Sequence, residues 1–176
     1  MTIQIVPLRF EDASLLEAVS AALKEVLGAK VAIAQNGFSL EEGRDRFRNQ
    51  VDSTWVLSHL LETYPKCIDK VLGITEQDLF IPVLTYVFGE AELGGRVAVV
   101  SSHRFRDELY GLPAEPQKMR DRLITESLHE LGHTFGLTHC HSTECVMRTS
   151  CCAEEIDFKP ARFCSPCSER LRRAST

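Results

Sequence analysis

Three histidines and one glutamate lie close together in residues 129–139, which read HELGHTFGLTH and match HExxHxxGxxH at every fixed position. His129 and His133 are four residues apart, so on a helix they point to the same side and can bind one metal ion. Gly136 lets the helix end and the chain turn back, which brings His139 in from another direction. Three neutral imidazoles leave a fourth tetrahedral position open, the arrangement typical of a catalytic zinc site.

Glu130 lies beside the two helical histidines rather than in line with them, and the metal does not need it as a ligand. Zinc can lower the pKa of a water in the open position to about 7 in favourable sites. A carboxylate next to that water can take its proton and return it to a leaving amine. The four residues therefore predict metal-assisted hydrolysis of peptide bonds.

The cysteines indicate a second metal site. Six of the seven lie between Cys140 and Cys167, which in an intracellular chain favours metal binding over a disulfide framework. The CxxC pair Cys164 and Cys167 can place two thiolates on one ion, and Cys140 with Cys145 can complete a Cys₄ site. Such a site is closed and therefore structural, so we expect it to hold the C-terminal segment beside the histidines.

Three cysteines lie outside this pattern. Cys67 precedes an apolar segment, so we expect it to be a small buried hydrophobic residue. Cys151 and Cys152 are adjacent and could bind metal, undergo oxidation or have no role.

The histidines are expected on a helix of roughly five turns that follows the loop containing Pro113 and Pro116. Its apolar residues form one narrow stripe that should face the core, while the metal-binding histidines fall on the opposite side. The stripe consists of Ile124, Leu128, Leu131 and Phe135.

The preceding chain alternates strand and helix patterns, which predicts an α/β fold. Strands are expected at 3–8, 30–34 and 70–74, and helices at 12–27 and 53–64. Two β-rich runs, 83–93 and 96–101, flank Gly94 and Gly95, whose positive φ angles should form a tight hairpin. One antiparallel strand in a mixed sheet follows from this hairpin.

The composition is that of an ordinary globular chain, because 44% of the 176 residues are hydrophobic and 26% are charged. No apolar run is long enough to span a membrane, and the first residues lack the features of a signal peptide. A net charge of −5 argues against nucleic acid or anionic membrane as a partner. These observations predict a cytoplasmic location, and the chemistry of the histidine motif predicts a peptide or protein substrate.

The residues of the two clusters resemble the metzincin zinc peptidases, and specifically the archaemetzincins, in which the long zinc motif runs directly into Cys140, Cys145 and Met147 and is followed by a later CxxC. The resemblance implies two zinc ions per chain. One is catalytic, with Glu130 as general base and Met147 in a turn beneath the metal, and its ligands are His129, His133 and His139. The other is structural, and its ligands are Cys140, Cys145, Cys164 and Cys167.

The resemblance also implies a fold and a domain organisation. We expect one α/β (α+β) metallopeptidase domain, residues 1–176, with a metzincin-like, or zincin-like, mixed sheet and an antiparallel edge strand. Residues 1–136 should form an upper subdomain that includes the active-site helix, and residues 137–176 a zinc-clamped C-terminal subdomain with the Met-turn. The hairpin within residues 83–101 should bind substrate as an added strand.

Two other functions fit parts of the sequence. The chain could be a zinc-stabilised peptide-binding or adaptor module with little or no turnover, although the intact Glu130 favours an enzyme. A thiol redox protein built on Cys164 and Cys167 is disfavoured, because this CxxC does not follow a βαβ strand.

Overall fold

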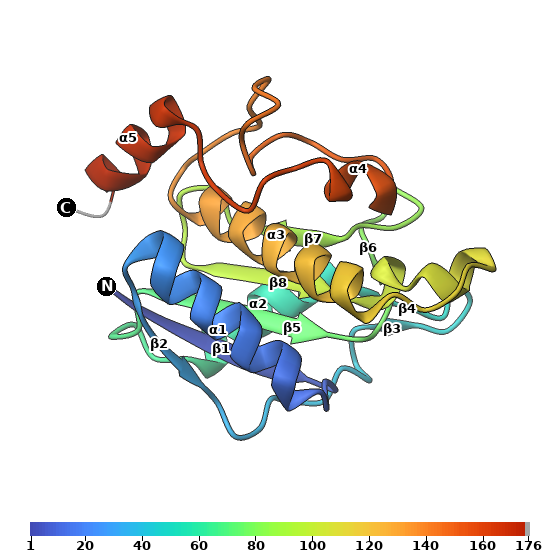
Figure 1. Ribbon diagram of the computed structural model, residues 1–176. Coiled ribbons are helices and arrows are strands. Elements are labelled where there is room, and N and C mark those ends of the chain that lie inside the picture. Colours follow the sequence, from blue (N-terminus) through green and yellow to red (C-terminus); the bar gives the residue numbers. More distant parts are fainter. Residues whose placement is uncertain (175–176) are drawn as a thin grey trace.

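The computed structural model describes residues 1–174 and is built on a five-stranded mixed sheet (Figure 1). The strand order is β2-β1-β5-β8-β7. Four strands run parallel, namely β2 (Lys30–Ile33), β1 (Thr2–Leu8), β5 (Lys70–Thr75) and β8 (Val97–Ser101). The edge strand β7 (Gly89–Ala91) is antiparallel to β8, as the hairpin predicts.

Helices cover both faces of this sheet. The helices α1 (Ala13–Leu27) and α3 (Pro116–Thr134) lie on one face, and α2 (Ser53–Thr63) lies on the other (Figure 1). Strand β8 is buried on both of its faces. Ala98 and Val100 belong to the core under α1 and α3, while Val97 and Val99 belong to the core with α2. A parallel strand buried on both faces reads as a continuous apolar run for this reason.

Local signals set the ends of α1. The Asp12 side chain accepts a hydrogen bond of 3.1 Å from the backbone N–H of Leu15 and so caps the helix start. Gly28 ends the helix in the left-handed conformation at φ 62°. The predicted helices at 12–27 and 53–64 and the strands at 3–8, 30–34 and 70–74 are therefore confirmed to within a residue or two.

The predicted hairpin is only partly right. Its first strand is confined to β7, because the chain bends at Pro82 and Val87 instead donates a backbone hydrogen bond of 2.9 Å to Leu79. Of the two turn glycines, Gly94 has a positive φ, of 68°, and Gly95 does not. Gly95 packs instead against the Glu92 side chain.

A small second sheet was not predicted. It has the order β3-β4-β6, with strands β3 (Arg44–Asp45), β4 (Gln50–Asp52) and β6 (Leu79–Phe80). Strands of two or three residues carry too few alternations to give a sequence pattern, and their pairing is decided by packing.

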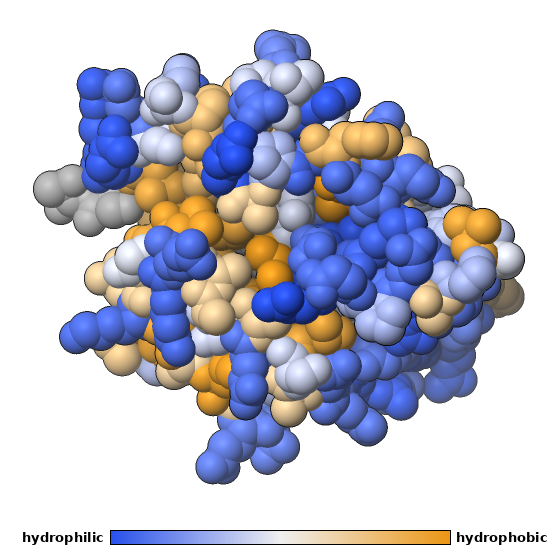
Figure 2. Space-filling model, in the orientation of Figure 1, coloured by the Kyte–Doolittle hydropathy of each residue, from blue (hydrophilic) through white to orange (hydrophobic). Residues whose placement is uncertain are grey.

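Two 3₁₀ turns, η1 (His103–Phe105) and η2 (Asp107–Tyr110), connect β8 to α3. The C-terminal part, which follows α3, packs on the outer side of that helix and contains little regular structure. It has two helices, α4 (Ala153–Asp157) and α5 (Ser165–Ala174), joined by irregular chain (Figure 1). Figure 2 shows that hydrophilic and apolar side chains are intermixed on this face of the molecule. No helix within residues 1–174 has both the length and the apolar character needed to cross a bilayer.

Candidate metal centres and active-site cleft

The three histidines of the motif meet at the end of α3. His129 and His133 lie on its last turns, and Gly136, with φ 79°, reverses the chain so that His139 returns to them. The ring centroids are 4.8 to 5.3 Å apart, and one nitrogen of each ring lies within 4.8 Å of the others. The structure thus brings together the three residues that the spacing predicts.

The hydrogen bonds of two rings fix their tautomers. His129 Nδ1 lies 2.8 Å from the carbonyl of Val146, and His133 Nδ1 lies 2.7 Å from the carbonyl of Leu137. A carbonyl only accepts, so both Nδ1 atoms carry the proton and both Nε2 atoms present lone pairs. The metal ligands of known sites are oriented by carbonyl partners in the same way.

The distance between these lone pairs tests whether the site fits a cation. The Nε2 atoms of His129 and His133 are 3.2 Å apart. Two lone pairs at this distance repel each other, whereas nitrogens on a tetrahedral zinc ion are about 3.3 Å apart. The donor set therefore fits zinc.

Burial keeps the imidazoles neutral. It lowers the pKa of His129 well below the ordinary value, and it also lowers the pKa of His133 and of His139. The Lys159 ammonium acts in the same direction on all three rings. Neutral imidazole is the form that binds a metal.

Glu130 lies next to the histidines but outside their ligand group. Its side chain is buried, and burial, followed by the nearby Glu126, raises the pKa of this carboxyl well above the ordinary value. The edge strand passes directly over it, because a Cβ on Gly89 would come within 2.6 Å of Glu130 Cγ. This close approach places the carboxylate in the cleft between α3 and β7.

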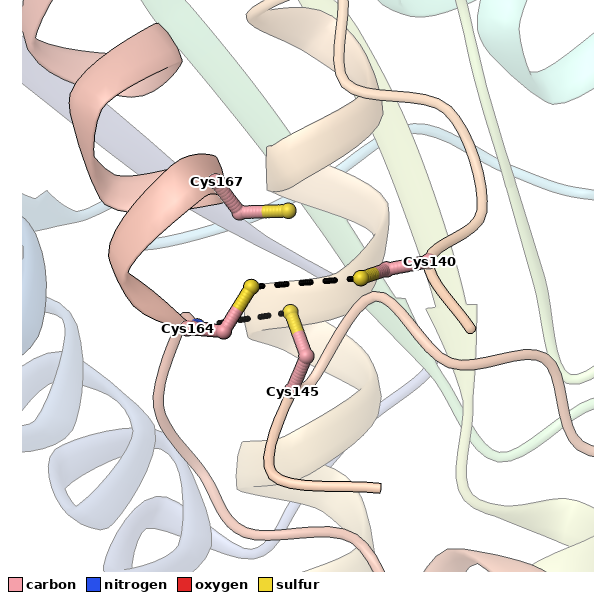
Figure 3. A group of neighbouring side chains, drawn as sticks. All are labelled: Cys140, Cys145, Cys164 and Cys167. Carbon is pink, nitrogen blue, oxygen red and sulfur yellow. Dashed lines mark hydrogen bonds between the residues drawn. The ribbon is translucent and has the colours of Figure 1, made fainter. Parts of the chain in front are cut away.

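The four cysteines that the sequence predicts as a set converge on one point (Figure 3). The Sγ atoms of Cys140 and Cys164 are 3.9 Å apart, close to the roughly 3.8 Å between sulfurs on a tetrahedral zinc ion. The Cys164 backbone N–H donates to Cys145 Sγ over 3.4 Å, and Cys167 comes from the first turn of α5. All four sulfurs lie within 4.8 Å of one another, so the cluster fits a closed metal site.

Met147 lies between the helix that carries two of the histidines and the cysteine cluster. It is fully buried, and a Cβ on Gly132 of α3 would come within 2.3 Å of its sulfur. Its carbonyl accepts a hydrogen bond of 2.9 Å from the Cys140 backbone N–H. Met147 thus packs beneath the active-site helix and next to the cysteine cluster.

A cavity of about 450 Å³ opens beside the histidines. It lies between α3, the segment that precedes β7 and the chain after Met147, and its lining includes Tyr86, Phe88, Glu126, Glu130, Ser150 and Cys151. A second cavity of about 370 Å³ lies on the other side of the histidines and is bounded by Ala91, Leu93, His133 and Thr138 among others. Together they form a cleft that runs along β7.

The remaining cysteines do not join either cluster. Cys67 is exposed, so the prediction of a buried residue is wrong, because the segment before β5 is a surface turn. Cys151 is exposed and lines the larger cavity, and Cys152 is partly buried.

Sequence reasoning missed two buried charged residues near the site. Glu126 lies one turn before Glu130 on α3, and its carboxylate Oε1 is 2.6 Å from Lys159 Nζ. The sequence held a partial indication of Glu126, because it lies four residues before Glu130 on the same helix face. The partner, Lys159, had no local signal.

Comparison with known proteins agrees with this geometry. The sequence profile of Peptidase family M54 matches residues 41–173. An archaemetzincin from Methanocaldococcus jannaschii is 42% identical over 71% of this chain and 68% of its own, and one from Archaeoglobus fulgidus is 34% identical over 98% and 99%. The crystal structure of an archaemetzincin from Methanopyrus kandleri superposes with a TM-score of 0.87 at 34% identity, over 99% of this chain and 95% of that one. The chain therefore belongs to peptidase family M54, the archaemetzincins, and is a zinc-dependent metallopeptidase.

Proposed function

We propose that His129, His133 and His139 hold the catalytic zinc ion of a peptidase in which Glu130 is the general base. The observation that carries this proposal is the pair of Nε2 lone pairs that face each other across 3.2 Å, next to a buried carboxylate in an open cleft. When bound, zinc supplies the Lewis acidity that lowers the pKa of water to about 7 in favourable sites.

Glu130 performs the proton transfers. Its carboxylate takes the proton of the attacking water and then returns that proton to the nitrogen of the leaving amine. The peptide bond breaks, and one water is consumed: its hydroxyl stays on the carbonyl carbon and its proton goes to the amine. Burial raises the pKa of Glu130, which makes its carboxylate a stronger base for the proton of the water.

The edge strand positions the substrate. Phe88 and Glu92 exchange backbone hydrogen bonds with β8, through Ser101 N to Phe88 O at 2.8 Å and Glu92 N to Val97 O at 3.0 Å. Because pairing alternates along an antiparallel strand, Gly89 and Ala91 turn their backbone groups away from β8. These groups are free to pair with a peptide that lies in the cleft as an added strand.

A second, structural zinc ion is bound by Cys140, Cys145, Cys164 and Cys167. Sulfur spacing near that of a tetrahedral ion supports this assignment, as does the closure of the set by four protein ligands. This ion ties Cys140, directly after the third histidine, to α5. Residues 1–176 then act as one domain, with an upper subdomain 1–136 and a C-terminal subdomain 137–176 that carries Met147.

The substrate is a peptide or protein rather than nucleic acid or membrane, and the enzyme works in the cytoplasm. The net charge of −5 supports the first statement. Seven cysteines without a disulfide among them support the second, because a reducing compartment preserves free thiols for metal binding.

A peptide-library digest combined with metal analysis tests the mechanism. Protein that contains two zinc ions per chain should cleave library peptides, and Glu130→Gln protein with the same zinc content should not. A native protein that holds both ions and cleaves no peptide would instead support a peptide-binding or adaptor module.

A further inference from the structure

A buried ion pair lies beside the larger cavity, and one of its two residues lines it. Glu126 is 3% exposed and lines the cavity, and Lys159 is 6% exposed. Lys159 Nζ is 2.6 Å from Glu126 Oε1 and also donates a hydrogen bond of 3.0 Å to the Arg148 carbonyl. The pair therefore connects α3 to the chain that follows Met147, and Glu126 is the member of the pair that lines the cavity.

The lining of the cavity combines apolar and polar residues. Tyr86 and Phe88 pack edge to face with ring centroids 5.5 Å apart and form one wall. The Tyr86 hydroxyl donates a hydrogen bond of 3.1 Å to the Cys151 carbonyl, which closes the outer side. Ser150 also lines the cavity, and its buried Oγ has no hydrogen-bond partner among residues 1–174.

The negative charge of Glu126 and the positive charge of Lys159 offset each other, so the pair presents little net charge to the cavity. An ionised side chain that entered would lose its hydration and would meet a carboxylate and an ammonium together, so attraction to one is offset by repulsion from the other. A neutral side chain with an apolar stem avoids this cost, and its polar tip can use the Glu126 oxygens or Ser150.

From this arrangement we propose that Glu126 and Lys159 determine specificity, by making the cavity select a long neutral side chain with a hydrogen-bonding tip at the substrate residue next to the cleaved bond. The proposal rests on the proposed function, because it places that bond at the three histidines. It assigns to Glu126 contact with the side chain, and to Lys159, which lies behind Glu126, an electrostatic effect on whatever enters the cavity.

Peptides capped with a hydroxamate, which binds zinc without being cleaved, test the proposal through binding alone. The panel varies one side chain beside the hydroxamate among Gln, Glu, Lys and Ala, and calorimetry measures each Kd on zinc-loaded protein. The native protein should bind the Gln peptide about tenfold more tightly than the Glu or Lys peptide.

Two nearly isosteric substitutions should shift this preference in opposite directions. Glu126→Gln leaves the Lys159 cation unpaired, so the Glu peptide should gain about tenfold relative to Gln. Lys159→Met leaves the Glu126 carboxylate unpaired, so the Lys peptide should gain by a similar factor. A role in stability alone would not produce opposite charge preferences.

The double variant Glu126→Gln with Lys159→Met keeps the cavity neutral and should retain the native preference, even where a single variant unfolds. Glu115→Gln is the matched control, since it removes an exposed ion pair with Lys118 at the start of the same helix and should change no Kd ratio. Zinc content and Tm are measured for every variant.

The possible outcomes separate this proposal from the proposed function. A native protein that binds hydroxamates tightly without discriminating among Gln, Glu and Lys overturns the cavity assignment alone. The same conclusion follows if the double variant loses the native preference, or if folded single variants shift it in the same direction. A zinc-loaded native protein that binds no hydroxamate overturns the proposed active site itself.

Discussion

Gly89 of the edge strand lies against Glu130 of the active-site helix, with no room for a side chain between them. A Cβ at position 89 would lie 2.6 Å from Glu130 Cγ and 2.6 Å from the Val99 carbonyl oxygen. The sheet edge that is proposed to hold the substrate and the carboxylate that is proposed to transfer the proton are therefore positioned by one contact.

Substitution Gly89→Ala should lower peptidase activity while zinc remains bound. The added methyl group must displace Glu130 or β7, and a misplacement of about 1 Å can reduce a rate about 10²-fold. Steady-state kinetics and zinc analysis of the purified variant measure both effects.

Gly28→Ala is the control for this change. Gly28 has φ 62° with nothing within 4 Å of an added Cβ, and it lies at the end of α1. This variant should lose about 1 kcal/mol of stability through backbone strain and keep its activity. Native activity in Gly89→Ala would show that the contact does not position Glu130.

Glu130→Ala should separate the general base from the metal ligands. All three histidines remain, so zinc content should stay at the native level, whereas activity should fall by at least about 10² to 10⁴. His133→Ala removes a ligand and should lose both activity and the metal of that site. Turnover of Glu130→Ala at the native rate, on a peptide that the native protein cleaves, would refute the mechanism.

The two metal sites should respond differently to a chelator. The histidine site lines the open cleft and should lose its ion first with the fold intact, while the closed cysteine site combines metal binding with folding. Elemental analysis and circular dichroism during a chelator titration follow both steps. A single zinc ion in fully loaded protein would contradict the assignment.

Cys164→Ser should destabilise the protein and affect activity only indirectly. Loss of one structural ligand loosens the segment that holds Met147, and a loss of about 3 kcal/mol would lower Tm by roughly 6 to 12 °C. Cys67→Ser is the matched control, because Cys67 is an exposed free thiol outside the cluster. If Cys164→Ser keeps the native Tm and metal content, Cys151 or Cys152 becomes the better ligand candidate.

Features encoded over a few residues could be predicted from the sequence alone. The four-residue spacing of His129 and His133 places them on one helix face, and Gly136 provides the reversal to His139. The apolar stripe of α3 was predicted correctly for Leu128, Leu131 and Phe135, which are buried, while Ile124 is half-buried. The opposite side of α3 is also buried, because the C-terminal segment covers it.

Features that depend on residues far apart in the chain were decided by the tertiary structure. The short sheet β3-β4-β6, the close approach of Gly89 to Glu130 and the pairing of Glu126 with Lys159 have no local pattern. Periodicity shows which side of an element is apolar, but it does not show which distant segment will cover that side. The sequence by itself therefore determined the candidate metal ligands, and only the packing of the C-terminal segment on α3 decided the shape and charge of the cavity beside them.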